Sequence, residues 1–117
     1  MPENLKVDED WVPDACTLPT VEQPLRRQEF DDLFAEDVIS VDQTSARLVR
    51  LELRADPATA AHAARLAGME TACCSFFTFE LTITDGRVSM AISTEAAHER
   101  VLGALGARAQ ARLGTNA

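Results

Sequence analysis

The sequence predicts an α+β domain, a two-layer sandwich in which helices cover one face of a three-stranded sheet. Two patterns support this prediction. Some segments carry an apolar stripe at helical spacing, and others carry apolar residues at every second position. Each strand-like segment has one apolar and one polar side, so the helices should cover a single face of the sheet. The expected order of elements is α-β-α-β-β-α.

The first helix is expected to begin between residues 21 and 24 and to end near Val38. Thr20 and Gln23 have the spacing of a capping box, and Pro24 suits the first turn of a helix. An apolar stripe at helical spacing follows, made of Phe30, Leu33, Phe34 and Val38. The stripe predicts the face that packs on the core.

A strand is expected at 48–54, where apolar residues alternate with arginine and glutamate. Asp56 and Pro57 then predict the start of a second helix, as its N-cap and its first helical residue. An alanine-rich stretch of high helix propensity extends this helix to about Cys74. Cys73 and Cys74 therefore lie where a helix is expected to end.

A β-hairpin is expected around the turn Asp85-Gly86, because apolar and polar residues alternate on both sides of it. A final helix should start near Thr94 and Glu95 and end before Gly114. This helix contains Gly103 and Gly106, each of which weakens a helix by about 1 kcal/mol relative to alanine. We expect both glycines to permit close packing on the sheet.

The length of 117 residues fits one α+β domain at 15–114, preceded by a disordered acidic leader at 1–14. The leader has five acidic residues and one lysine, which give half of the net charge of -8. Such an acidic chain does not suit a nucleic-acid surface. An apolar run of membrane-spanning length and a secretory signal are both absent from the sequence, which predicts a cytoplasmic protein without a membrane partner.

The three cysteines are the most informative residues. Cys16 precedes the first helix, and Cys73 and Cys74 are adjacent. If the chain brings the three together, their thiolates favour soft ions such as Hg(II), As(III), Cu(I) or Zn(II). A set of two or three sulfurs suits Hg, As or Cu better than structural zinc, which prefers four ligands. The spacing is not C-x-x-C, and nothing in the sequence indicates an organic cofactor.

Glu70 precedes Cys73 by three residues and Cys74 by four, so it lies one helical turn away on the same face. Its carboxyl group could bind a metal, take a proton from a thiol, or give a proton to a leaving group, which makes it the candidate catalytic residue. Simpler interpretations of the cysteines, Glu70 and the two histidines are also open. The cysteines could be buried small hydrophobes, and Glu70, His62 and His98 could all face solvent.

These residues resemble a small bacterial domain that occurs alone or as a C-terminal extension of regulators of the mercury-resistance type. The resemblance covers about residues 15–113, and its distinctive parts are the segment Ala15-Cys16-Thr17-Leu18 and the pattern Glu70-x-x-Cys73-Cys74-x-Phe76-Phe77. It implies a heavy-metal context with Cys16, Cys73 and Cys74 as ligands and Glu70 as the acid. The chain lacks a helix-turn-helix part, so regulation by DNA binding does not carry over.

The sequence thus favours a cytoplasmic domain that binds a soft metal ion in sequestration, sensing or resistance. Two alternatives remain open. One is a thiol-dependent enzyme, acting in organomercurial cleavage or redox exchange. The other is a metal-independent interaction module that forms a homodimer through the open face of the sheet.

Overall fold

The computed structural model describes residues 23–73 and 76–113. The expected boundary between a leader and the domain, at residues 14 and 15, lies outside these ranges. The elements are helix α1 (Gln23–Glu36), strands β1 (Val38–Ser45) and β2 (Leu48–Leu53), helix α2 (Pro57–Cys73), strands β3 (Thr78–Thr84) and β4 (Arg87–Ser93), the short 3-10 helix η3 (Ala96–His98) and helix α3 (Glu99–Arg112).

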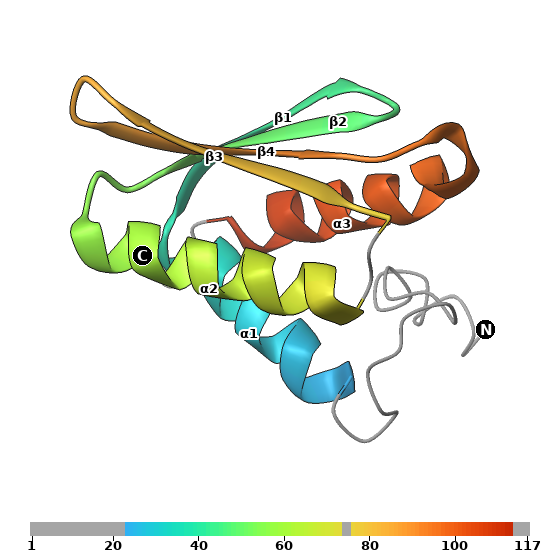
Figure 1. Cartoon of the computed structure of the whole chain (residues 1–117), viewed down its shortest axis with the longest axis horizontal. Coiled ribbons are helices and arrows are strands. Elements are labelled where there is room, and N and C mark those ends of the chain that lie inside the picture. The colour runs from blue at the N-terminus through green and yellow to red at the C-terminus, as the bar shows by residue number, and fades with distance from the viewer. Residues whose placement is uncertain (1–22, 74–75, 114–117) are drawn as a thin grey trace.

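The strands form a four-stranded antiparallel sheet in the order β1-β2-β4-β3. The helices lie together beneath one face of this sheet, with α2 under β3 and α3 under β1 and β2, and the other face is left open (Figure 1). The α+β class is therefore confirmed. The predicted three-stranded sheet and the order α-β-α-β-β-α are wrong, because the chain has the order α-β-β-α-β-β-α.

Strand β1 was missed because it lacks the alternation that identifies a half-buried strand. It lies at the edge of the sheet, and only Val38 and Val41 among its residues are shielded from solvent. Its pairing with β2 is also interrupted twice, between Val38 and Ser40 and between Gln43 and Ser45. Each interruption shifts which side chains face inward, so period two is lost from the sequence.

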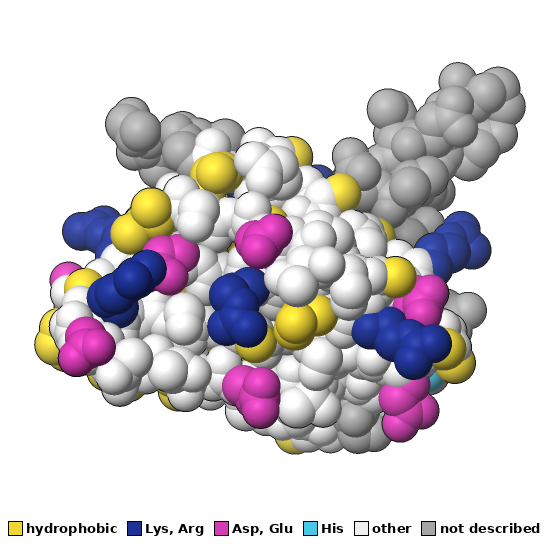
Figure 2. All heavy atoms as spheres, turned by 90° about the horizontal axis from the view of Figure 1, so that it is seen from above, with side chains coloured by type: hydrophobic (Ala, Val, Ile, Leu, Met, Phe, Trp, Pro, Cys, Tyr) yellow, Lys and Arg dark blue, Asp and Glu magenta, His cyan; other side chains and the backbone are white. Residues whose placement is uncertain are grey.

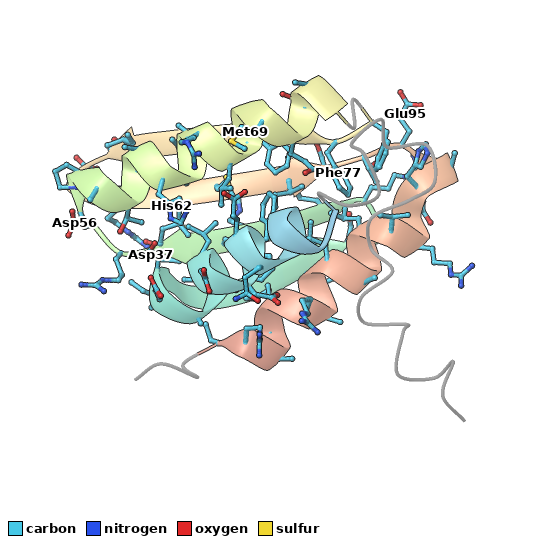
Figure 3. The ribbon with its side chains drawn as sticks, turned by 90° about the horizontal axis from the view of Figure 1, so that it is seen from below. Asp37, Asp56, His62, Met69, Phe77 and Glu95 are labelled. Carbon is cyan, nitrogen blue, oxygen red and sulfur yellow. The ribbon has the colours of Figure 1, made fainter. Side chains whose placement is uncertain are left out.

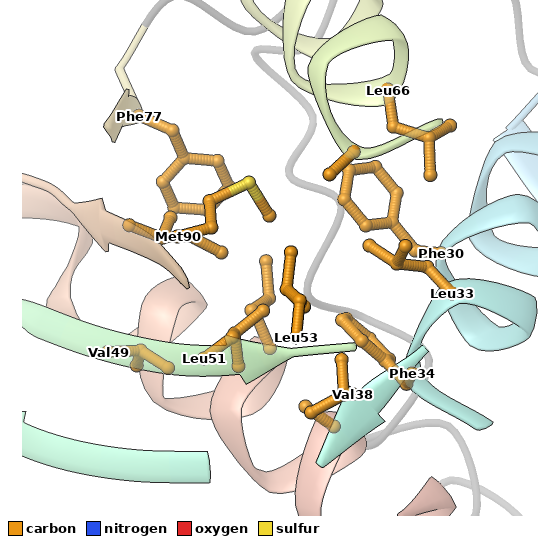
Figure 4. Close-up of a cluster of buried hydrophobic side chains, with 14 of the residues drawn as sticks. Phe30, Leu33, Phe34, Val38, Val49, Leu51, Leu53, Leu66, Phe77 and Met90 are labelled. Carbon is orange, nitrogen blue, oxygen red and sulfur yellow. The ribbon is translucent and has the colours of Figure 1, made fainter. Parts of the chain in front are cut away.

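The core lies between the sheet and the helices (Figure 4). Strand β2 pairs with β4 without a register shift, and this pairing sets Leu51 opposite Met90. Both side chains are fully buried, as are Phe30, Leu33 and Phe34 of α1. The apolar stripes predicted for the first helix and for the strands that became β2 and β4 therefore do form the core, whereas Ile83 of β3 is 63% exposed.

Local sequence signals place most element ends correctly. Asp56 caps α2, because its Oδ1 accepts a hydrogen bond of 2.8 Å from the backbone N–H of Ala58. Asp85 and Gly86 have φ angles of 50° and 69°, as expected for a two-residue hairpin turn. Helix α1 ends two residues early, at Glu36, because the chain turns at Asp37 into β1. None of the helices in the described ranges is long and apolar enough to cross a membrane.

The last helix starts later than expected, because η3 occupies the segment before Glu99. Close packing is confirmed for only one of its two glycines. A Cβ atom added at Gly106 would lie 2.5 Å from Oε1 of Gln43 and 3.2 Å from Cγ2 of Val49, whereas one added at Gly103 would meet nothing within 4 Å. Gly106 therefore lets α3 approach β1 and β2 closely.

An ion pair joins α1 to α3 beneath the core. Asp31 is only 4% exposed, and its two carboxylate oxygens accept hydrogen bonds of 2.8 and 2.7 Å from Nε and Nη2 of Arg108. Nη2 of Arg112, one turn later, lies 3.3 Å from Oδ2 of the same carboxylate. A bidentate pair of this kind fixes both distance and orientation, so it sets how the two helices pack.

Replacing Arg108 by alanine should lower the free energy of unfolding by about 3 kcal/mol, because it leaves a buried carboxylate with weaker compensation. The matched control is Arg47→Ala, which removes an exposed pair with Glu99 and should cost less than about 1 kcal/mol. Urea denaturation of both variants measures the difference. Equal losses for the two variants would contradict the structural role given to Asp31.

Candidate functional site

Glu70 is buried in the last turns of α2. Its side chain is 1% exposed, and it continues a core-facing stripe that contains Ala63 and Leu66 at helical spacing. The solvent-facing reading of Glu70 is therefore wrong. Burying a carboxylate costs several kcal/mol unless a proton, a hydrogen bond or a cation compensates it. The burial of Glu70 therefore makes it a candidate for a chemical role.

The cysteines lie largely outside the described residues. Cys73 is the last residue of α2 within the described part of the chain. The side chain of Cys73 and the whole of Cys16 and Cys74 are outside the description, so convergence of the three thiols stays a prediction. Among the described residues, no group of three or more His, Cys, Asp or Glu side chains is placed to hold a metal ion.

Aromatic rings gather where the chain enters β3 after the cysteine pair. Phe76 contacts Phe77 with ring centroids 4.6 Å apart, and it stacks on His98 with centroids 4.2 Å apart and planes within 12°. The hydroxyl of Thr94 donates a hydrogen bond of 2.9 Å to the backbone carbonyl of Phe76. His98 is partly buried in this stack. The solvent-facing reading of His98 is therefore also wrong.

Sequence reasoning missed His98 because the residue lies in η3, ahead of α3, where helical periodicity gives no guidance. Its contact partner is also distant along the chain. The signal available for Glu70 was stronger. A glutamate that falls on the stripe of Ala63 and Leu66 breaks the apolar pattern, and such a break is the sign of a buried polar group.

The other end of α2 carries a second polar cluster (Figure 3). Asp37, in the turn between α1 and β1, accepts a hydrogen bond of 3.1 Å from the hydroxyl of Thr59. Nδ1 of His62 lies 3.5 Å from the other carboxylate oxygen of Asp37. The side chain of His62 is 33% exposed. His62 is thus partly exposed, as expected for a solvent-facing residue, but it also contacts Asp37.

This cluster joins elements that are far apart in the sequence. Thr59 is 4% exposed and Asp37 is largely buried, so their hydrogen bond is shielded from water. The backbone carbonyl of Asp37 also accepts a hydrogen bond of 2.8 Å from the N–H of Arg54. The arrangement ties the first turns of α2 and the end of β2 to the turn after α1, and it fixes the direction in which α2 leaves the sheet.

No protein-family model, curated protein or solved structure matches the chain. The likeness to the Cys-Cys-x-Phe-Phe domain thus rests on the residues quoted for it and stays a prediction.

The hydrogen bond between Asp37 and Thr59 should couple the two residues by about 1 kcal/mol in a double-mutant cycle of Asp37→Ala and Thr59→Val. Asp37→Ala alone should lower the free energy of unfolding by about 1–3 kcal/mol, because it leaves a buried hydroxyl without its acceptor. Asp42→Ala, at an exposed site on β1, is the control and should change stability by less than about 0.5 kcal/mol. Additive losses at Asp37 and Thr59 would count against the shielded bond.

Proposed function

We propose that the protein binds a soft metal ion of the Hg, As or Cu type through thiolates of Cys16, Cys73 and Cys74. The observation that carries this proposal is the position of Glu70. A carboxyl group that is 1% exposed lies one turn before the residue at which α2 ends, and that residue is the first cysteine of the pair. The role would be sequestration, sensing or resistance in the cytoplasm.

The end of α2 at Cys73 supports a joint role for the adjacent cysteines. Neighbouring residues inside a helix point about 100° apart, which prevents both side chains from reaching one ion. Both cysteines can reach one ion if the helix ends at this pair, and the bounds of α2, Pro57–Cys73, are compatible with such an end. The pair alone would supply the two sulfurs that linear Hg(II) coordination needs, and Cys16 would complete a three-sulfur site for As(III).

The surroundings of the pair also favour thiolate chemistry. A metal ion binds the thiolate, so each thiol loses a proton when the ion arrives. Glu70 lies three residues before Cys73, within reach of a proton released there. Phe76 and Phe77, which follow the pair, contact each other with ring centroids 4.6 Å apart, and apolar side chains near a metal site limit the access of water to it.

Titration of the reduced protein with Hg(II), As(III), Cu(I) and Zn(II) tests the proposal. We expect tight binding of the first three and weaker binding of Zn(II). Changing Cys73 or Cys74 to serine should reduce the affinity at least about a hundredfold, since each change removes one of the few soft ligands. Met69→Leu is the control, because it removes the other sulfur that is nearest to the pair in the sequence. Equal, weak binding by wild type and the triple Cys→Ser variant would refute the thiolate site.

Burial of Glu70 favours a second candidate function, the cleavage of organomercurials. In this reaction the cysteine thiolates bind the mercury, and the carbon–mercury bond breaks while its electron pair takes the proton of the Glu70 carboxyl group. The products are a hydrocarbon and Hg(II) held by sulfur, with Glu70 left as carboxylate. A carboxyl group shielded from water is suited to hold a proton for such a step.

Release of hydrocarbon from a simple organomercurial distinguishes the enzyme from the binding protein. If Glu70 supplies the proton, Glu70→Gln should reduce release at least about a hundredfold while the affinity for Hg(II) changes little. Glu80→Gln, an exposed glutamate on β3, should leave both unchanged. Stoichiometric Hg(II) binding without any hydrocarbon from the wild type would exclude the enzyme and leave the binding function standing.

A further inference from the structure

The two edges of the sheet differ in how well they resist pairing with another chain. Edge strand β1 is interrupted by two register shifts, which bend a strand and hinder further pairing. Edge strand β3 pairs with β4 through seven consecutive positions, Thr78–Thr84, without a shift. It contains no proline or lysine, and Glu80 is its only charge. By these criteria, and among the residues that the structure describes, β3 is an unprotected edge.

Apolar surface accompanies this edge. Ile83 of β3 belongs to the side of the strand that faces the core, yet its side chain is 63% exposed. It borders a hollow of about 400 Å3 whose other walls come from the start of α2 and from β4, including Pro57, Ala60 and Val88. Among the described residues, no helix or loop covers the apolar surface at this edge of the sheet.

Helix α2 presents small, uncharged residues beside the same edge. Ala60 lines the hollow, and Ala64, Ala67 and Thr71 continue from it along one side of the helix. Arg65 lies on the other side, near Glu29 of α1. Gly68 is exposed next to this stripe, and a Cβ atom added there would meet nothing within 4 Å. A glycine in the middle of a helix weakens it. Packing within one copy of the described chain gives no reason for a glycine at position 68.

We propose that two copies of the chain associate through β3, edge to edge and antiparallel, to form one continuous eight-stranded sheet. A two-fold axis at Leu81 sets Thr78 opposite Thr84 and Phe79 opposite Ile83 of the second copy. Every apolar residue then meets an apolar one, and the exposed Ile83 becomes covered. Neighbouring strands lie about 4.8 Å apart, so the two α2 helices are brought close together, and small side chains allow their approach.

Charge selects this register. With the axis at Leu81, the carboxylate of Glu80 lies opposite the hydroxyl of Thr82, and no like charges meet. An axis at Glu80 would set two carboxylates against each other, which is unfavourable. An axis at Thr82 would place Phe79 opposite Asp85 in the hairpin turn. Only the register centred on Leu81 pairs all seven residues of β3 without a conflict.

The open face of the sheet fits a second copy less well than this edge does. Figure 2 shows basic and acidic side chains interspersed across that face. They include Arg87 and Glu52, which pair with each other at 3.3 Å. A face on which charges of both signs are mixed is typical of a solvated surface.

Sedimentation of the full reduced, metal-free chain over a range of concentrations tests the proposal. We expect a species of twice the chain mass of 12.7 kDa. Ile83→Thr should weaken the dimer at least about tenfold, because it removes apolar area that the second copy covers. The matched control is Ile39→Thr, which changes an isoleucine of similar exposure, 58%, on β1 and should have no effect. A chain that is monomeric at every concentration would overturn the proposal.

A charge exchange tests the register. Thr82→Glu should weaken the dimer at least about tenfold, because it places a second carboxylate opposite Glu80 twice in each dimer. Adding Glu80→Arg to this variant should restore the wild-type affinity, since each new arginine then faces a new glutamate. Thermal unfolding at monomeric concentrations separates these effects from changes in the fold. A dimer that ignores Thr82→Glu but dissociates with Arg50→Glu would assign the interface to the open face instead.

Discussion

The pairing of β2 with β4 is the interaction on which the rest of the structure depends. Each of the two hairpins, β1-β2 and β3-β4, would be only marginally stable alone. Their central strands are joined by no turn, because α2 lies between them in the sequence. They meet through buried pairs such as Leu51 with Met90 and Val49 with Ile92, and all four of these residues are 0% exposed. Burial of this apolar surface between the sheet and the helices offsets the loss of chain entropy when β2 and β4, separated in the sequence by α2 and β3, are brought together.

The same pairing determines the course of α2. The helix must carry the chain from the end of β2 to the start of β3, which lies beyond β4 at the far edge of the sheet. Its 17 residues span about 25 Å, and both of its ends carry polar groups that are unusual in a core. Thr59 and His62 meet Asp37 at the first end, and Glu70 is buried near the second. Because β3 begins soon after α2 ends, the cysteine pair is confined to the junction between these two elements.

Local sequence signals predicted what depends on neighbouring residues. The Asp56-Pro57 helix start, the Asp85-Gly86 turn and the apolar stripe of α1 were all correctly placed, since capping, turn geometry and periodicity act within a few residues. Strand β1 could not be recognised, because an edge strand with two shifts in its pairing has no regular inward side. The stacking of His98 on Phe76 depends on how α3 packs, which no local pattern encodes. Convergence of Cys16 with Cys73 and Cys74 also depends on contacts between segments that are distant in the sequence, so local patterns do not predict it.

The proposed thiolate site at the end of α2 and the proposed interface along β3 are neighbours in the sequence, but they are separable in space. In an antiparallel pair centred on Leu81, Thr78 of one copy lies beside Thr84 of the other. The two Thr78 residues are then separated by the length of β3, about 20 Å for six steps along a strand. Each cysteine pair precedes its own β3, so the two pairs lie toward opposite ends of the two paired β3 strands. One metal ion could not bridge the two pairs across such a span, so each chain would bind its own ion. Metal affinity should consequently be independent of association, and a dimer that formed only with metal would have to use a different surface.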